Sequence, residues 1–190
     1  MLSLAFEKQN DTLFRFLPLG AFARSICARD AARIVVFFKK QSAARPQKEN
    51  AMLSRGFIQE EKMLELTEAL PLYESVGWVN YTKNPGMLER SLRHSLVVLC
   101  FRSEGKLLGL LRAVGDGHSA LYVQDLLVLP EVQRMGIGKA LVKELDKLYP
   151  NVYQKVLMTD DTPENARFYE GCGFLSASGM RCAAYVQFKK

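Results

Sequence analysis

A glycine-containing turn between two apolar segments places the strongest constraint on how this chain folds. The turn at residues 133–138 follows a strand-like run at 122–129 and precedes a helix-like run at 140–148. Glycine accepts backbone conformations with positive φ, which a tight turn needs. The N–H groups at the start of a helix lack partners within the helix and, with the helix dipole, attract anions. Because Arg134 and Lys139 add positive charge beside it, the turn is predicted to hold a phosphate or a pyrophosphate.

Two common phosphate-binding motifs do not match this turn. A Walker A loop has a glycine where this chain has Gln133, and a serine or threonine where it has Ala140, so that motif is excluded. A dinucleotide fingerprint has its third glycine where this chain has Leu141, and its first glycine directly after the strand. The acidic pair at 160–161 lies near the position of that fingerprint's ribose-binding carboxylate. A dinucleotide-binding protein therefore stays open as an alternative.

The pattern Q-x-x-G-x-G, after a strand that ends in V-x-P, resembles the acetyl-CoA signature of the GNAT (GCN5-related) N-acetyltransferases. A second match lies at residues 163–174, which end in F-Y-x-x-x-G-F and resemble that family's fourth helix. The resemblance covers residues 55–188. Segments 72–82, 122–125 and 155–161 are similar to a bacterial GNAT group related to plant plastid acetyltransferases.

The resemblance implies an α/β protein with a single GNAT acyl-CoA N-acyltransferase domain. In such a domain a mixed central sheet with a splayed strand pair is flanked by helices. The apolar pattern alone indicates only an α/β fold with a mixed sheet. Helices are expected at 60–75 (broken near Pro71), 87–94, 138–149 and 163–171. Strands are expected at 55–59, 96–101, 106–114, 122–129, 155–159, 175–178 and 183–188.

The same resemblance implies a binding site for acetyl-CoA as co-substrate, without a metal. In this family the strand before the glycine turn splays from its neighbour, and the pantetheine arm lies in the gap. Backbone groups of Leu126, Leu127 and Val128 are implied as its contacts. The residues implied around the pyrophosphate are Arg134, Met135, Gly136, Ile137, Gly138 and Lys139.

The implied reaction is direct transfer of the acetyl group through a tetrahedral intermediate, in which an acid that protonates the departing thiolate helps it leave. By resemblance this acid is Tyr169; alternatively its ring packs in the core, as expected for Phe168. The substrate-facing strand positions are Tyr122 and Gln124, and Gln124 is the candidate catalytic residue there. Neither is a convincing base, so a water chain is an alternative route for the amine proton. Asp125 directly follows Gln124. Because successive side chains of a strand point to opposite faces, Asp125 is expected to face the other side of the sheet and to make structural hydrogen bonds.

Three aromatic residues are expected near the acceptor pocket, namely Tyr73, Trp78 and Tyr81. They form an apolar wall or hold a cation over a ring, or they pack a helical segment onto the sheet. With Tyr122 they are the candidate substrate-binding residues. The expected acceptor is a primary amine of a small molecule, arylalkylamine-like or other. A protein lysine or N-terminus as acceptor, and a non-catalytic CoA-binding regulatory module, are the alternatives.

Composition excludes several other classes of protein. No long uncharged apolar run exists in the 190 residues, so no membrane span is expected. The net charge of +6 is concentrated in residues 1–50, where nine Lys and Arg face four Asp and Glu. The remaining chain is nearly neutral, which argues against a nucleic-acid partner. The four cysteines have neither disulfide-framework nor zinc-ligand spacing. We therefore expect a cytoplasmic protein with reduced thiols, and a homodimer remains open.

Residues 1–51 are interpreted as an N-terminal extension and residues 52–190 as the N-acetyltransferase domain. A polar, proline-containing stretch at 42–50 separates the two. The extension is expected to be poorly ordered or not native, with the native chain starting at Met52. A targeting presequence, which its arginines and few acidic residues allow, and a docking arm are the alternatives.

Overall fold

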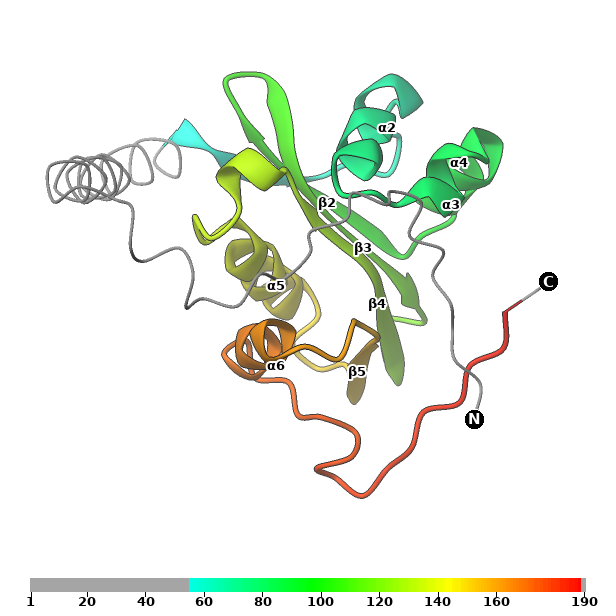
Figure 1. Cartoon of the computed structure of the whole chain (residues 1–190), viewed down its shortest axis with the longest axis vertical. Coiled ribbons are helices and arrows are strands. Elements are labelled where there is room, and N and C mark those ends of the chain that lie inside the picture. The colour runs from blue at the N-terminus through cyan, green and yellow to red at the C-terminus, as the bar shows by residue number, and fades with distance from the viewer. Residues whose placement is uncertain (1–54, 189–190) are drawn as a thin grey trace, which may run out of the picture. The chain divides into compact units, whose positions relative to one another are not determined.

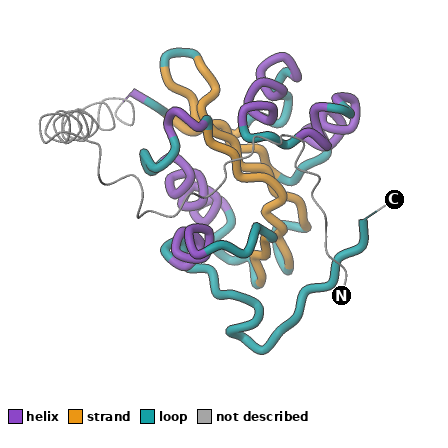
Figure 2. Tube along the Cα trace, viewed as in Figure 1, coloured by secondary structure: helices purple, strands orange, loops and turns teal. Residues whose placement is uncertain are grey.

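The structure is a computed structural model that describes residues 55–188. In this part of the chain, strands form one sheet and helices lie on both of its faces (Figures 1 and 2). The strands are β1 (Phe57–Glu60), β2 (Val97–Ser103), β3 (Lys106–Gly115), β4 (Ala120–Val128) and β5 (Gln154–Leu157). The helices are α2 (Leu66–Ser75), α3 (Val79–Thr82), α4 (Pro85–Arg93), α5 (Ile137–Leu148) and α6 (Pro163–Glu170), with a 3₁₀ helix at Pro130–Val132.

The sheet has the order β1-β2-β3-β4-β5. Neighbouring strands from β1 to β4 are antiparallel, whereas β4 and β5 are parallel. The parallel pair needs a crossover connection, and α5 supplies it. Helices α5 and α6 lie on one side of the sheet, and α2, α3 and α4 lie on the other (Figure 1). This mixed sheet flanked by helices confirms the predicted fold class.

Each face of the sheet has its own apolar core. On the α5 side, apolar residues recur at helical spacing along α5 and pack on β2, β3 and β4. The buried residues of α5 are Ile137, Leu141, Val142 and Leu145. On the other side, α2 and α4 pack on the same strands through Ala69, Leu72, Tyr73, Leu88 and Leu92. Burial of a large apolar side chain contributes roughly 1.5–3 kcal/mol. The second core therefore holds α2 to α4 over the middle of the sheet.

Two helical details differ from the prediction. Helix α2 begins at Leu66 and continues through Pro71 to Ser75. A proline inside a helix removes one backbone donor, but Leu72 and Tyr73 are buried directly after it and anchor the helix. The short helix α3, which the sequence analysis did not predict, holds Tyr81.

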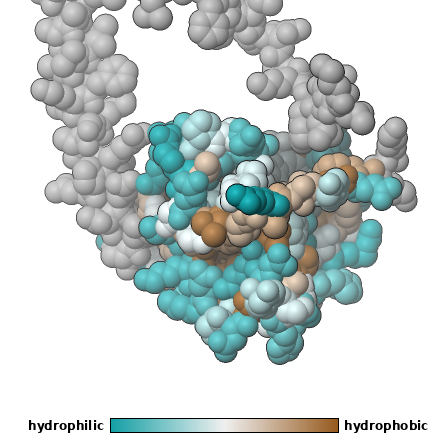
Figure 3. All heavy atoms as spheres, turned by 90° about the horizontal axis from the view of Figure 1, so that it is seen from below, coloured by the Kyte–Doolittle hydropathy of each residue, from teal (hydrophilic) through white to brown (hydrophobic). Residues whose placement is uncertain are grey.

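The strands predicted at 175–178 and 183–188 are wrong, because the described chain forms no strand after β5. The segment after α6 closes a turn on itself, in which the Cys182 N–H donates to the Ala177 carbonyl at 2.8 Å. An alternating apolar pattern forms a strand only where it pairs with a neighbouring strand, and in the described chain no strand pairs with residues 175–188. Apolar side chains stay exposed along this segment, and Figure 3 shows apolar areas among hydrophilic ones on the face seen from below.

Among the described residues, no helix is both long enough and apolar enough to cross a membrane. The predicted division of the chain at residues 51 and 52 lies outside residues 55–188 and stays a prediction.

Candidate active site

Strands β4 and β5 separate in the middle of β4. Their last paired residues are Val123 and Leu157, yet β4 continues to Val128. On the side away from β3, the later β4 residues therefore have no partner strand within residues 55–188. Apart from the Val128 carbonyl, which accepts from the Gln133 side chain, their backbone polar groups on that side are available to another partner. The predicted pantetheine contacts Leu126, Leu127 and Val128 all lie in this unpaired part of β4. An extended ligand with amide groups fits such a gap.

The glycine turn joins the end of β4 to α5. Gly136 precedes the helix with a φ of 85°, and Arg134 also takes a left-handed conformation, with a φ of 64°. The Gln133 side-chain amide donates to the Val128 carbonyl at 3.0 Å, which holds the turn against the end of the strand. The first turn of α5 contains no acidic residue, and Lys139 is exposed there. The N–H groups at the start of α5, the helix dipole and the exposed positive residues nearby, Arg134 and Lys139, together fit a pyrophosphate.

The six residues predicted around the pyrophosphate differ in their exposure. The exposed ones are Arg134, Gly136 and Lys139. Met135 and Gly138 are half-buried. Ile137 is buried and packs on β3, where a Cβ added to Gly109 would stand 2.9 Å from the Ile137 Cγ2. Only the backbone of Ile137 is therefore available to a ligand.

Helix α6, which carries Tyr169, packs against the glycine turn. The ring of the preceding residue, Phe168, contacts the backbone of Gly138, where an added Cβ would stand 3.2 Å from the ring Cζ. The Tyr169 ring packs edge-on against Phe168 and Phe174, with ring centroids 4.9 and 6.0 Å apart. Burial raises the pKa of the Tyr169 phenol above its ordinary value. The phenol therefore stays protonated at neutral pH, as a proton donor must.

A β-bulge at Gln124 changes which side chains share a face of the sheet. Val123 and Asp125 pair with consecutive residues of β3, which leaves Gln124 without a partner. A bulge turns neighbouring side chains to the same side of a strand. The prediction that Asp125 faces away from Gln124 is therefore wrong. Both side chains reach the Tyr81 hydroxyl, through Asp125 Oδ1 at 3.0 Å and Gln124 Nε2 at 3.3 Å.

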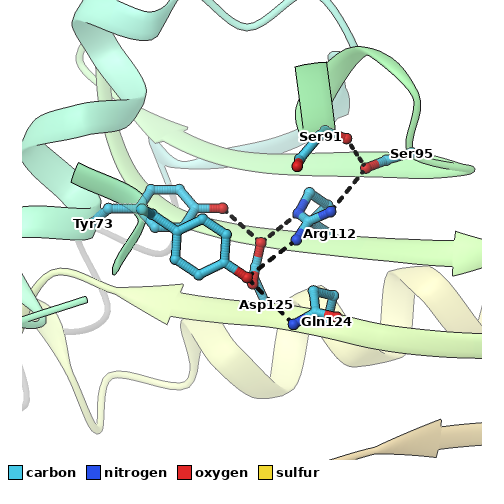
Figure 4. Close-up of polar contacts among 7 residues, drawn as sticks. Tyr73, Ser91, Ser95, Arg112, Gln124 and Asp125 are labelled. Carbon is cyan, nitrogen blue, oxygen red and sulfur yellow. Dashed lines mark hydrogen bonds and ion pairs between the residues drawn. The ribbon is translucent and has the colours of Figure 1, made fainter. Parts of the chain in front are cut away.

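Asp125 is the centre of a buried polar network (Figure 4). Its carboxylate accepts hydrogen bonds from the Tyr73 hydroxyl at 2.7 Å, from the Tyr81 hydroxyl at 3.0 Å and from Arg112 Nε, its ion-pair partner. Arg112 also donates to Ser95 Oγ and to the Tyr81 oxygen, each at 3.4 Å. Burial, and then the nearby carboxylate, raise the pKa of both tyrosines. The network is fully paired: no buried side-chain nitrogen or oxygen in the described part of the chain lacks a hydrogen-bond partner.

The predicted aromatic residues form one cluster over this network. The rings of Trp78 and Tyr81 stack with their centroids 5.8 Å apart, and Tyr73 lies 5.1 Å from Tyr81. Tyr73 is fully buried and serves to hold Asp125. Trp78 and Tyr81 are half-buried, as is Tyr122, which alternation along β4 places on the side of Gln124. These three have exposed surface that an acceptor can contact.

Arg112 is the residue of this site that the sequence analysis missed. It is a single arginine in an otherwise apolar strand, Leu107 to Val114, and its side chain is only 6% exposed. A charge in an apolar strand needs a buried partner of opposite charge. The signal was therefore present in the sequence, and Asp125, the acidic residue of the next strand, is that partner.

Several known proteins that resemble this chain in sequence and structure are acetyltransferases, in agreement with the fold and the site described above. Residues 94–175 match the family model of the acetyltransferase (GNAT) domain. An acetyltransferase of the GNAT family from Streptococcus pneumoniae has 38% sequence identity and a TM-score of 0.65, over 71% of this chain and 98% of that one. The uncharacterized N-acetyltransferase ycf52 of Porphyra purpurea is 27% identical over 63% of this chain and 70% of its own length. The chloroplastic GCN5-related N-acetyltransferase 3 of Arabidopsis thaliana is 37% identical over 38% of this chain and 30% of its own.

The chain belongs to the GNAT family and is an acetyltransferase. This confirms the family that the glycine turn and the F-Y-x-x-x-G-F segment predicted. The match to a chloroplastic acetyltransferase also agrees with the similarity that segments 72–82, 122–125 and 155–161 indicated.

Proposed function

We propose that this acetyltransferase moves the acetyl group of acetyl-CoA to a primary amine of a small molecule. The observation that carries the proposal is the separation of β4 from β5 directly before the glycine turn. A pantetheine arm in that gap would pair with free backbone groups among residues 124–127, and its pyrophosphate would lie at the start of α5. Arg134 and Lys139 would add charge to that contact.

The chemistry required of the protein is modest. A neutral amine nitrogen attacks the thioester carbonyl carbon, a C–N bond forms, and the C–S bond breaks as the tetrahedral intermediate collapses. The amine loses one proton to solvent, and the departing thiolate gains one. We assign the second proton to the Tyr169 phenol, which the proximity of α6 to the turn and the raised pKa of Tyr169 support. A free backbone N–H of β4 in the gap can stabilise the oxyanion.

The acceptor side of the site is assigned to the face of β4 that carries Tyr122 and Gln124. Trp78 and Tyr81 close over this face from α3 and the residue before it. Stacked rings beside a polar group suit an amine on an apolar, ring-bearing group, since such rings bind apolar surface and attract cations. An arylalkylamine is therefore our first choice of acceptor.

A thiol-release assay with acetyl-CoA tests this function. The acceptors are tryptamine, a polyamine, an amino sugar and a lysine peptide, and CoA release is followed with a thiol reagent. Turnover greatest with tryptamine is the expected result. Turnover greatest with the peptide would move the assignment to a protein acetyltransferase. No release with any amine, in a preparation that binds acetyl-CoA, would indicate a non-catalytic CoA-binding module.

A further inference from the structure

We propose that the side-chain carbonyl of Gln124 is the hydrogen-bond acceptor that positions the incoming amine, and that Tyr81, Asp125 and Arg112 fix its direction. The inference rests on the proposed function, because it concerns the acceptor of that reaction. Gln124 is then a positioning residue whose neighbours fix which end of its amide faces the ligand. An amide without such neighbours could present either end.

The direction of the hydrogen bonds follows from the carboxylate. Asp125 forms an ion pair with Arg112, and its side chain is fully buried. An ionised carboxylate can only accept hydrogen bonds. The Tyr81 hydroxyl, 3.0 Å from Asp125 Oδ1, must therefore donate its proton to that oxygen. Since the proton is committed, the Tyr81 oxygen can act toward its other neighbours only as an acceptor.

Gln124 is one of those other neighbours. Its amide lies 3.3 Å from the Tyr81 oxygen and must present its NH₂ group to it. The two ends of an amide look alike in shape, and the hydrogen-bond network decides which is which. Here the network gives one answer: Nε2 points to the Tyr81 oxygen, so the carbonyl oxygen points away from it.

The Gln124 carbonyl oxygen is free to bind a ligand. None of the hydrogen bonds among the described residues involves it. Gln124 is half-buried, and no buried side-chain oxygen in this part of the protein lacks a partner, so this oxygen must reach solvent. The Gln124 carbonyl oxygen is thus an accessible hydrogen-bond acceptor to which no protein group donates. It favours a ligand that donates an N–H group.

The place of Gln124 in the sheet matches this role. It is the bulged residue directly after Val123, the last residue of β4 that pairs with β5. It therefore stands where the gap between the strands opens. An amine that donates one N–H to the Gln124 carbonyl is held by that contact at the mouth of the gap. An uncharged carbonyl also favours the ammonium form less than a carboxylate does, which leaves more of the amine neutral and reactive.

The test compares Gln124→Met with wild type, using tryptamine and acetyl-CoA. Methionine keeps the length of the side chain but has no amide. We expect kcat/KM for tryptamine to fall about tenfold, the size of one net hydrogen bond, while KM for acetyl-CoA changes less than about twofold. Gln154→Met is the matched control, because it makes the same change at an exposed position of β5. It should leave both constants unchanged.

Tyr81→Phe distinguishes positioning from packing. It removes the acceptor that orients the Gln124 amide, so part of the effect of Gln124→Met should already appear in it. The double variant should then be no worse than Gln124→Met alone, since both changes break one chain of interactions. Fully additive losses, or unchanged kcat/KM for tryptamine in a folded Gln124→Met protein, would overturn this proposal alone. An inactive wild type would overturn the proposed function as well.

Discussion

The ring of Phe168 lies against the backbone of Gly138, so that a Cβ on this glycine would stand 3.2 Å from the ring Cζ and 3.8 Å from Val128 Cγ2. The contact joins the helix of the glycine turn to the helix that carries Tyr169. The second glycine of the turn therefore serves the packing of α6 as well as the approach of a ligand. A side chain at Gly138 would therefore press on Phe168, the neighbour of the proposed acid Tyr169.

The first prediction tests this contact with a double-mutant cycle. Gly138→Ala should lower the melting temperature when Phe168 is present, because the ring must move to admit a methyl group. In a Phe168→Leu background the same change should be neutral or stabilising, since alanine favours a helix over glycine by about 1 kcal/mol. The expected coupling is at least about 0.5 kcal/mol. Equal effects of Gly138→Ala in both backgrounds would show that the contact between Gly138 and Phe168 does not contribute to stability.

The second prediction concerns Gly136, whose φ of 85° a β-branched residue does not readily adopt. Gly136→Val should raise the Kd for acetyl-CoA about tenfold or more, equal to about 1.4 kcal/mol, measured by calorimetry. Gly105 is the control, because it has a similar φ of 77° in the turn between β2 and β3, away from the site. Gly105→Val should carry the same backbone strain without a change in Kd. An unchanged Kd in Gly136→Val would remove the turn from the cofactor site.

The third prediction concerns the buried pair of Asp125 and Arg112. Asp125→Asn should lower the free energy of unfolding by about 3–5 kcal/mol, because the guanidinium is left buried without its counter-charge. Tyr73→Phe, which removes one hydrogen bond to the same carboxylate, should cost about 0.5–1.5 kcal/mol, or somewhat more because that bond is to a charge. Urea unfolding of both variants measures the difference. Similar small losses in both would mean that Arg112 reaches solvent or another anion in the variant.

The local elements of this fold could be predicted from the sequence, but the pairing between residues distant in the sequence could not. The hairpin of β2 and β3 and the helix after the glycine turn follow from turn residues and helical spacing, which are local signals. The direction of Asp125 does not, because the bulge at Gln124 arises from pairing with β3. The tail after α6 has a strand-like alternation but forms no strand, because a strand needs pairing with a distant segment, which local spacing does not show. The single arginine in an apolar strand indicated that Arg112 has a buried partner, but the register between β3 and β4 was needed to show that Asp125 lies across from it.

The fourth prediction concerns residues 1–51, which lie outside the described part of the chain. A protein that starts at Met52 keeps every helix and strand of the described fold. We expect it to melt cooperatively and to bind acetyl-CoA with the Kd of the full chain. If its melting temperature falls by more than about 5 °C, on the order of 1–2 kcal/mol for a domain of this size, residues 1–51 contribute to the folded domain.

The last prediction concerns Tyr169 as the proton donor. Tyr169→Phe removes the phenol but keeps the ring that packs on Phe168 and Phe174. A positioned general acid is typically worth about 10²–10⁴-fold in rate, so kcat should fall by that order. The Kd for acetyl-CoA and the melting temperature should stay close to wild type. A tyrosine that only packs predicts the reverse, a lower melting temperature and a nearly normal kcat in the folded fraction.

The pH dependence adds a second measurement of the same assignment. Burial raises the pKa of Tyr169 above its ordinary value, so the protonated, active form persists up to a pH above about 10. The acceptor amine loses its proton near pH 10, so the wild-type rate should rise with pH through the neutral and mildly alkaline range before the phenol ionises. Tyr169→Phe should show the same rise at a lower rate, and its high-pH decline should be absent. A wild-type rate that declines with a pKa well below 10 would assign the acid to another group.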